Sequence, residues 1–150
     1  MRRLEAEIQI GVPAENVWEI LMDLESYKEW NPFVREITGE IKVGNTIEVR
    51  LKVPGRRERI FKPKIIKLEP NKELRWLGHM WWNGVFDAEH VFNLEKLEAD
   101  QTRFTQLELF SGFLVPFIMG SQRRNIIDGI KSMNRALKER AHKIARDTRD

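Results

Sequence analysis

The sequence contains no cysteine and no hydrophobic run long enough to cross a bilayer. Without thiols, the chain cannot form disulfides, a cysteine-ligated zinc or iron–sulfur centre, or a cysteine nucleophile. Its longest apolar run, from Phe113 to Met119, contains Pro116 and falls far short of the roughly 20 residues that a transmembrane helix needs. These absences exclude thiol chemistry and predict a chain without a transmembrane segment.

The N-terminus also lacks the pattern of a secretory signal peptide. Charged residues lead directly into an alternation of apolar and polar residues from Leu4 to Ile10, without an apolar core or a cleavage site. We therefore expect a cytoplasmic protein. No linker-like segment or internal repeat divides the sequence, so residues 1–150 are expected to form a single domain. A chain of this length can build a core without a structural metal.

Charge is nearly balanced overall but uneven along the chain. Lys and Arg number 26 against 23 Asp and Glu, yet eight basic residues and a single acid, Glu58, lie between Arg50 and Lys67. Such a cluster is compatible with contact to nucleic acid or anionic lipid. A solvated strand edge, whose charges discourage pairing with another sheet, is the favoured interpretation. No specific nucleic-acid partner is expected.

Hydrophobic periodicity predicts an α+β fold. Leu4 to Ile10 alternates like a strand, Ala14 to about Asp23 has helical spacing, and a second short helix near Glu25–Glu29 ends before Asn31-Pro32. A period of two then predicts six strands at Phe33–Ile41, Thr46–Val53, Ile60–Leu68, Glu73–Trp82, Val85–Leu97 and Thr102–Ser111. After Gly112, a helical stripe from Met119 to Ile144 predicts one long C-terminal helix.

Five short motifs occur in order along these elements: Tyr27-x-x-Trp30-Asn31-Pro32-Phe33, Leu74-x-Trp76-x-Gly78, Glu89-His90-x-Phe92, Thr102-x-Phe104 and Glu108-x-Phe110-x-Gly112. With the order of elements, they resemble the START-like superfamily of the birch-pollen-allergen fold, and within it the SRPBCC proteins similar to polyketide cyclases and dehydrases. The resemblance covers nearly the whole chain. It implies a helix-grip fold, in which a curved antiparallel sheet of seven strands wraps around the long C-terminal helix, with two short helices after the first strand.

The same resemblance implies a hydrophobic cavity between the sheet and the C-terminal helix. Such a cavity would bind a small lipid, polyketide or isoprenoid-like molecule. A carrier protein would also transport it. The resemblance does not imply a reaction, because one fold serves many functions.

The register of one hairpin follows from its pattern. If Trp82-Asn83-Gly84 forms a three-residue loop with Gly84 in the left-handed conformation, Trp76 pairs with His90. This register is favoured because it collects the apolar residues on one inward face: Leu74, Trp76, Gly78, Met80, Phe86, Ala88, His90, Phe92 and Leu94. The last strand is ambiguous by its apolar count, and only the motif resemblance favours an inward Glu108.

These facings give a set of candidate ligand contacts. The polar members are His90, Gln106, Glu108 and Arg123, because Arg123 lies at the margin of the helical stripe and is expected to reach inward. The apolar members are Trp30, Phe33, Val49, Leu51, Trp76, Phe92, Phe110, Phe117, Ile126 and Ile130. A buried carboxylate needs a partner, and Arg123 or His90 could supply one for Glu108. The polar groups could equally form a buried network without any role in ligand binding.

Three functions remain open, with ligand binding favoured. The first alternative is a cyclase or dehydratase, a lyase or isomerase in which His90 and Glu108 act as acid and base. His79 is expected on the outer face of the sheet and His142 in solvent, which leaves His90 as the histidine placed for chemistry. No metal-ligand cluster or dinucleotide fingerprint occurs, so no metal or cofactor is expected.

The second alternative is a protein-interaction module without a ligand. Trp81 and Trp82 are adjacent at a hairpin tip, where they could form a partner surface, a transient membrane contact or a lid over the cavity. One of them could instead tuck into the core. The sequence does not choose between a monomer and a homodimer.

Overall fold

The order of elements predicted from the sequence is present in the computed structural model, which describes residues 2–149. The elements are β1 (Arg2–Ile10), α1 (Ala14–Met22), the 3-10 turn η1 (Leu24–Ser26), α2 (Tyr27–Trp30), β2 (Val34–Thr38), β3 (Glu48–Leu51), β4 (Arg59–Phe61), β5 (Lys64–Glu69), β6 (Glu73–Met80), β7 (Phe86–Glu98), β8 (Gln101–Ser111) and α3 (Val115–Arg149). The fold is α+β, with antiparallel strands packed on a long C-terminal helix and short helices after β1, the arrangement expected of the helix-grip fold.

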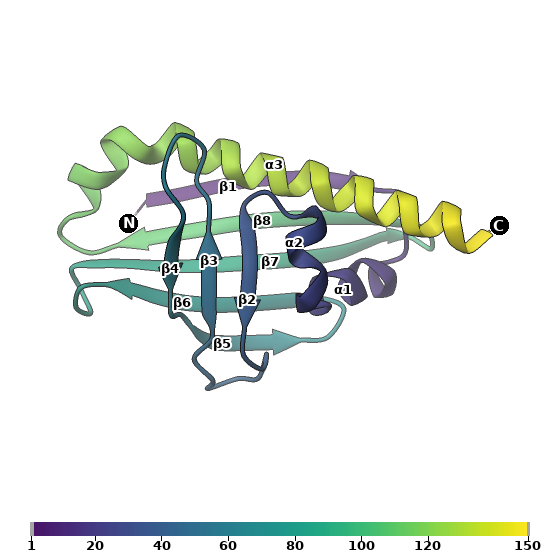
Figure 1. The fold of residues 1–150 in the computed structure, drawn as a ribbon, viewed down its shortest axis with the longest axis horizontal. Coiled ribbons are helices and arrows are strands. Elements are labelled where there is room, and N and C mark those ends of the chain that lie inside the picture. The colour runs from purple at the N-terminus through teal and green to yellow at the C-terminus, as the bar shows by residue number, and fades with distance from the viewer. Residues whose placement is uncertain (1, 150) are drawn as a thin grey trace.

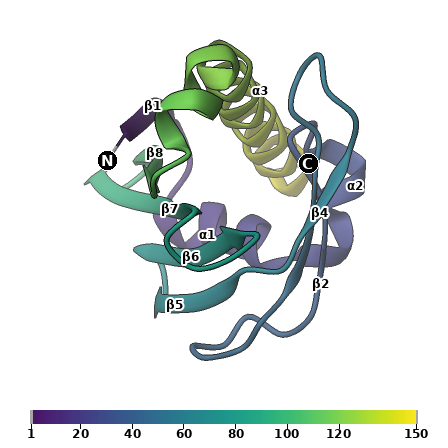
Figure 2. The same cartoon turned by 90° about the vertical axis from the view of Figure 1, so that its left-hand side faces the viewer.

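The strands form two hydrogen-bonded sheets that lie across one another. One sheet has the order β1-β8-β7-β6-β5, and the other has the order β2-β3-β4, with all pairs antiparallel. In Figure 1 the strands of the smaller sheet cross those of the larger one steeply. Seen from the end in Figure 2, the two sheets and α3 surround a common interior.

The expected strand Ile60–Leu68 is divided in two, so the described residues contain eight strands rather than seven. The break falls at Lys62 and Pro63, because proline has no N–H to donate to a ladder. The carbonyl of Pro63 instead accepts a hydrogen bond from the N–H of Ile47 at 2.9 Å. Consequently β4 extends the smaller sheet while β5 closes the edge of the larger one.

The hairpin formed by β6 and β7 has the predicted register. Trp76 pairs with His90, Gly78 with Ala88 and Met80 with Phe86. Gly84 adopts the expected left-handed conformation, with φ of 91°. The ladder ends at Met80 and Phe86, so the connection spans residues 81–85 and is longer than the three residues predicted. In β8 the burial alternates strictly and places Phe104, Gln106, Glu108 and Phe110 inward.

His142 was expected in solvent, but it is half-buried and connects α3 to the end of β1. Its Nε2 accepts a hydrogen bond from the N–H of Gly11 at 3.0 Å. Burial lowers the pKa of His142, and the nearby charges of Lys138 and Arg146 lower it further. A neutral imidazole is the form that can accept this bond.

The outer face of the larger sheet carries a buried carboxylate held by several donors. Burial by itself would raise the pKa of Glu73, but hydrogen bonds from Arg75, Lys67 and Asn93 outweigh it and lower the pKa to about 2. The shortest of these contacts joins Lys67 Nζ to Glu73 Oε2 at 2.7 Å. This cluster fixes the pairing of β5, β6 and β7 on the side of the sheet away from α3.

The 35 residues of α3 pack lengthwise on the sheet through the predicted apolar stripe (Figure 1). The buried residues of α3 are Val115, Met119, Gly129, Ile130, Met133, Asn134, Leu137 and Ala141. At Gly129 the helix approaches Phe33 so closely that an added Cβ would lie 2.5 Å from Phe33 Cδ1. No helix among residues 2–149 has both the length and the apolar character needed to span a membrane.

We predict opposite effects for two alanine substitutions in α3. Gly129→Ala should lower the free energy of unfolding by about 1 kcal/mol or more, because overpacking against Phe33 exceeds the gain of roughly 1 kcal/mol in helix propensity. Gly120→Ala should raise it by up to about 1 kcal/mol, because nothing lies within 4 Å of the added Cβ. Urea unfolding measures both values. Equal gains would contradict the close approach of α3 to Phe33.

Candidate functional site

A cavity of about 390 Å³ lies between the two sheets and the first half of α3. It is lined by Phe33, Val49, Leu51, Val53, Arg56, Arg59, Phe61, Pro63, Trp76, Gly78, His79, Met80, Trp81, Phe86, Ala88, His90, Glu108, Phe110, Ile118, Gln122 and Ile126. Its walls therefore come from β3, β4, β6, β7, β8 and α3, from the loop that joins β3 to β4, and from single residues just before β2, between β4 and β5 and in the β6–β7 turn.

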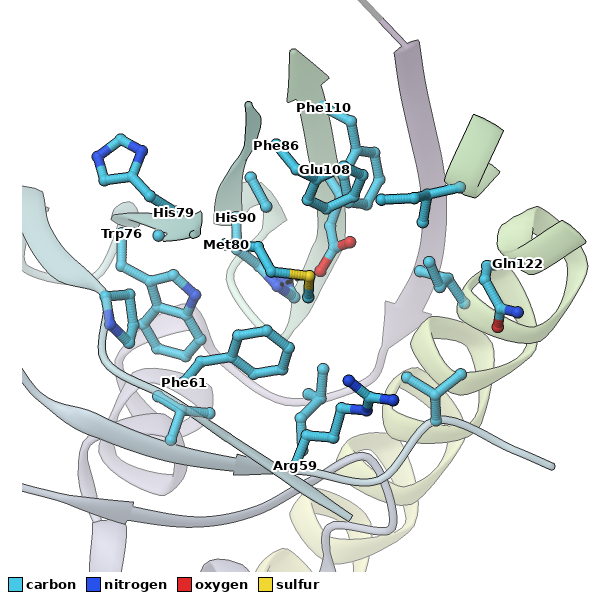
Figure 3. Close-up of a pocket in the computed structure, with 18 of the residues that line it drawn as sticks. Arg59, Phe61, Trp76, His79, Met80, Phe86, His90, Glu108, Phe110 and Gln122 are labelled. Carbon is cyan, nitrogen blue, oxygen red and sulfur yellow. Dashed lines mark ion pairs between the residues drawn. The ribbon is translucent and has the colours of Figure 1, made fainter. Parts of the chain in front are cut away.

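Apolar and aromatic side chains form most of the wall. In Figure 3, Phe61 faces the cavity from β4, while Phe86 and Phe110 face it from β7 and β8. The rings of Phe86 and Phe110 lie 5.6 Å apart between centroids. Met80 and Trp76 complete the wall on the β6 side (Figure 3). Such a wall favours an apolar ligand, because a polar one would lose hydration without gaining partners.

Glu108 and His90 supply the polar group in the wall of the cavity. Both side chains are buried, and Glu108 Oε1 lies 2.7 Å from His90 Nδ1. The two residues face each other across the ladder between β7 and β8, where they are direct partners. Figure 3 shows the Glu108 carboxylate projecting from β8 toward His90 and the interior of the cavity.

The proton on the other ring nitrogen of His90 is fixed by Gln106. The Nε2 of Gln106 lies 3.3 Å from the carbonyl oxygen of Ile130, which can only accept, so this end of the side chain must be the amide NH₂. The same nitrogen donates to Asn134 Oδ1 at 2.8 Å. Gln106 Oε1 therefore faces His90 Nε2 at 2.8 Å and must accept its proton in a hydrogen bond.

This assignment leaves one proton to be shared between His90 Nδ1 and Glu108 Oε1. Since Nε2 carries a hydrogen, Nδ1 is either the acceptor of a neutral histidine or the second donor of an imidazolium. In the first case Glu108 is a carboxylic acid, and in the second it is a carboxylate. Both forms satisfy the short contact, so the pair can hold this proton either on His90 Nδ1 or on Glu108 Oε1.

Aromatic rings hold the imidazole of His90 in place. Phe92 stacks on it with centroids 4.1 Å apart, and Trp76 lies tilted at 5.5 Å. Phe33 approaches from the smaller sheet at 6.4 Å. Because rings cover the imidazole and hydrogen bonds occupy both nitrogens, its orientation is fixed before any ligand enters.

Two arginines lie at the rim of the cavity. Arg56 Nε donates to Gln122 Oε1 at 2.9 Å, which links the loop between β3 and β4 to α3. In Figure 3 the side chain of Arg59 lies on the opposite side of the cavity from Glu108. Neither arginine forms an ion pair with any carboxylate among residues 2–149. Both side chains are exposed and β4 is the edge of the smaller sheet, as the interpretation of a solvated strand edge expects, although neither arginine was among the predicted ligand contacts.

Eight of the residues expected to contact a ligand line the cavity. They are Phe33, Val49, Leu51, Trp76, His90, Glu108, Phe110 and Ile126. Phe92 and Gln106 are buried and contact His90 without lining the cavity, and Ile130 is buried in the core between α3 and the sheet. Trp30 packs against the core away from the cavity wall.

The inward placement predicted for Phe117 and Arg123 is wrong, because both side chains are exposed. Phe117 lies two residues from the buried Val115 and Met119, which places it about 200° around the helix from each. Arg123 lies beside Gln122, which lines the cavity. Glu108 already has His90 as its partner, so no carboxylate is left inside to offset the desolvation of a guanidinium.

Several lining residues were missed for reasons that differ. Met80, Phe86 and Ala88 lie on the predicted inward face. The alternation predicts that they face inward, but it does not distinguish a cavity wall from a packed core. Phe61, Pro63 and Ile118 depend on how the smaller sheet folds over α3, and no local signal indicates that arrangement. His79 touches the rim, but its Nδ1 lies 2.6 Å from Asp87 Oδ1 and its ring points away from the interior (Figure 3).

The site contains few groups that could hold a metal. Within residues 2–149 no three His, Asp or Glu side chains converge as potential ligands. Glu108 and His90 already bond each other, His79 at the rim bonds Asp87, and Arg56, Arg59 and Gln122 contribute guanidiniums and an amide.

The family model described as "Polyketide cyclase / dehydrase and lipid transport" matches residues 1–142. The chain belongs to this family. No curated protein matches its sequence at a significant level. The START/SRPBCC resemblance predicted from the motifs is therefore confirmed at the level of the family and its fold.

Solved structures of this kind share the fold at low sequence identity. The Zhui aromatase/cyclase from Streptomyces sp. R1128 matches with a TM-score of 0.75 and 16% identity, over 95% of this chain and 94% of its own. A START superfamily protein from Mycobacterium smegmatis matches at 0.72 and 15%, over 95% and 98%. A norcoclaurine synthase mutant from Thalictrum flavum, in complex with a transition-state analogue, matches at 0.72 and 14%, over 96% of both chains.

We predict that His90→Phe lowers the free energy of unfolding by about 3 to 5 kcal/mol, because Glu108 then stays buried without its partner. Phenylalanine preserves the stacking on Phe92, so the loss reports the broken hydrogen bonds. The double variant His90→Phe/Glu108→Leu should recover part of this loss, because both ends of the pair are then apolar. Chemical unfolding at neutral pH tests both. A single-variant loss below about 1 kcal/mol would contradict a buried, paired Glu108.

Proposed function

We propose that the protein binds a small, largely apolar molecule carrying an oxygen function, inside the cavity between its sheets and α3. The observation that carries this proposal is an aromatic-walled space of about 390 Å³ with one preorganised polar pair, Glu108 and His90. This volume lies within the range of about 300 to 1,000 Å³ that is typical of small-molecule sites.

The pair supports recognition of a carbonyl or hydroxyl group. Because the shared proton lies between His90 Nδ1 and Glu108 Oε1, the second carboxyl oxygen of Glu108 can accept from a hydroxyl, and it can donate to a carbonyl oxygen when the pair takes up a second proton. Because aromatic walls exclude water, such a bond is stronger than it would be in solvent. The apolar body of the ligand would lie against Trp76, Phe86 and Phe110, where burial contributes about 25 cal/mol per Å² of apolar surface.

The family description and the neighbours support the same ligand class. The family covers polyketide cyclases and dehydrases as well as lipid transport, and one neighbour is titled an aromatase/cyclase. A lipid, a polyketide and an isoprenoid are all largely apolar molecules with few oxygen functions. We propose this whole class as ligands. Binding and transport is the favoured function, because it requires fewer functional side chains than catalysis does.

The direct test is native mass spectrometry of the purified protein beside its denatured mass, followed by extraction of any bound molecule. An apolar molecule with a carbonyl or hydroxyl group, bound one to one, is the result expected. A purely polar molecule would overturn the proposal.

A cavity-filling substitution should abolish binding while the fold survives. Ala88 faces the cavity between its pairing partners Gly78 and Phe110, so Ala88→Trp should reduce binding of the apolar fluorophore 1-anilinonaphthalene-8-sulfonate at least about tenfold. Leu109→Trp is the matched control, because Leu109 alternates with Glu108 on β8 and points to the outer face. Fluorescence titration measures both. Equal binding by the two variants would place the fluorophore outside the cavity.

A second candidate function is acid–base catalysis on a ketone. The observation that favours it is the contact of 2.7 Å between Glu108 Oε1 and His90 Nδ1, across which a proton can be transferred. A Glu108 carboxylate can accept a proton from the carbon next to a carbonyl, which leaves an enolate, and can return a proton to the same carbon. Aldol-type cyclisation and dehydration of a polyketide both begin with such a proton transfer.

Deuterium exchange tests this second function without knowledge of the substrate. We expect the protein to accelerate exchange of the α-protons of 2-tetralone in D₂O, followed by proton NMR. Glu108→Gln should reduce the protein-dependent rate at least about hundredfold, because general acid–base groups contribute 10²- to 10⁴-fold. Leu109→Gln on the outer face serves as the control. A Glu108→Gln variant as fast as the original protein would exclude this role for Glu108.

A further inference from the structure

Four large aromatic side chains are exposed where the β6–β7 turn meets the start of α3, at the end of the molecule that faces the viewer in Figure 2. The exposed fractions are 59% for Trp81, 75% for Trp82, 68% for Phe113 and 77% for Phe117. The other exposed large apolar side chains among residues 2–149 are aliphatic: Val43, Ile60, Ile66 and Ile144. We call the four aromatic residues the mouth surface, because Trp81 lines the cavity and Phe117 adjoins the lining residue Ile118.

Backbone contacts hold the two halves of the mouth surface together. The N–H of Phe113 donates to the carbonyl of Gly84 at 3.2 Å, and the N–H of Leu114 donates to the carbonyl of Val85 at 3.1 Å. Gly112, with φ of 120°, permits this approach, because a Cβ there would lie 2.5 Å from the Val85 oxygen. The tryptophan turn and the first turn of α3 are therefore positioned as one unit.

Trp81 adopts a left-handed backbone conformation, with φ of 69°. For a bulky side chain this conformation costs on the order of 1 kcal/mol or more. More than half of Trp81 nevertheless stays in solvent. A strained and exposed tryptophan indicates a surface that is built to contact something outside the chain.

The segments beside the mouth surface are basic. Residues 52–59 and 112–124 together contain Lys52, Arg56, Arg57, Arg59, Arg123 and Arg124 against the single acid Glu58. Glu58 itself lies near Arg35 and Arg50, at 4.0 and 3.6 Å. Acids elsewhere at this end are engaged, because Asp87 accepts hydrogen bonds from the Gly84 N–H and contacts His79.

From this juxtaposition we propose that the mouth surface docks on the surface of an anionic lipid bilayer. Tryptophan rings favour the boundary between headgroups and acyl chains, and nearby arginines are attracted to anionic headgroups. A second copy of this chain is a poorer occupant, because a two-fold contact through this surface would bring like-charged arginine segments together.

Docking would place the mouth of the cavity against the bilayer. An apolar ligand could then pass between the acyl chains and the cavity with little exposure to water. This consequence rests on the proposed binding function, whereas the docking itself does not. The two can therefore be tested separately.

The experiment is co-sedimentation with vesicles of phosphatidylglycerol and phosphatidylcholine, beside vesicles of phosphatidylcholine alone. The protein should sediment with the anionic vesicles, and about 0.5 M salt should weaken this binding because it screens the charges. Trp82→Ser/Phe117→Ser should reduce the partition coefficient at least about tenfold, since it removes two large aromatic side chains. Neither residue lines the cavity. Arg123→Gln/Arg124→Gln should reduce binding to the anionic vesicles several-fold.

Val43→Ser/Ile66→Ser is the matched control, because it removes exposed apolar side chains from other parts of the surface and should leave vesicle binding unchanged. Ala88→Trp should also sediment normally, because docking does not need the cavity. If the original protein docked but did not bind the fluorophore, only the proposed function would be contradicted. Absence of vesicle binding by the original protein would overturn the docking proposal. So would a dimer in sedimentation velocity that Trp82→Ser/Phe117→Ser converts to a monomer.

Discussion

The hydrogen-bond chain from Glu108 through His90 and Gln106 to Asn134 is the interaction on which the interior depends. It crosses from β7 and β8 to α3 through a core that is otherwise apolar, and each bond measures 2.7 or 2.8 Å. Bonding stabilises such a chain because an unpaired polar group in that surrounding costs more than one bond contributes; at its end, only Asn134 Nδ2 lacks a partner among the described residues. It therefore fixes the position of α3 relative to the sheet and, with it, the width of the cavity.

Packing around this chain follows from the same constraint. The rings of Phe92 and Trp76 cover His90 and restrict its rotation, while Gly129 lets α3 approach Phe33. Beyond the polar chain, toward the start of α3, the cavity occupies the space between the helix and the smaller sheet. The well-packed core around the polar chain thus holds the helix and the sheets in place on either side of the cavity.

Most of the larger sheet could be predicted from the sequence, because the facing and pairing of its strands depend on residues that are close to one another in the chain. The alternation in Glu73–Leu94 determines which residues face inward, and the turn at Gly84 determines the pairing of Trp76 with His90. The rest depends on contacts between distant segments. Nothing near Arg56 indicates that its loop crosses to Gln122 on α3, and the stripe that contains Arg123 does not reveal that Glu108 is already paired. The sequence shows Pro63, but it does not show that the strand before this proline joins one sheet and the strand after it joins the other.

The orientation of Gln106 has a further consequence for the chemistry of the interior. Because its amide fixes a hydrogen on His90 Nε2, moving the remaining proton between Nδ1 and Glu108 leaves the net charge of the core unchanged. In both forms the proton stays inside the bond between His90 and Glu108, so the second carboxyl oxygen of Glu108 presents an acceptor to a ligand without any exchange of protons with solvent. An alcohol would therefore be preferred to the corresponding ketone, because a ketone oxygen finds no donor on this pair until a second proton enters the site.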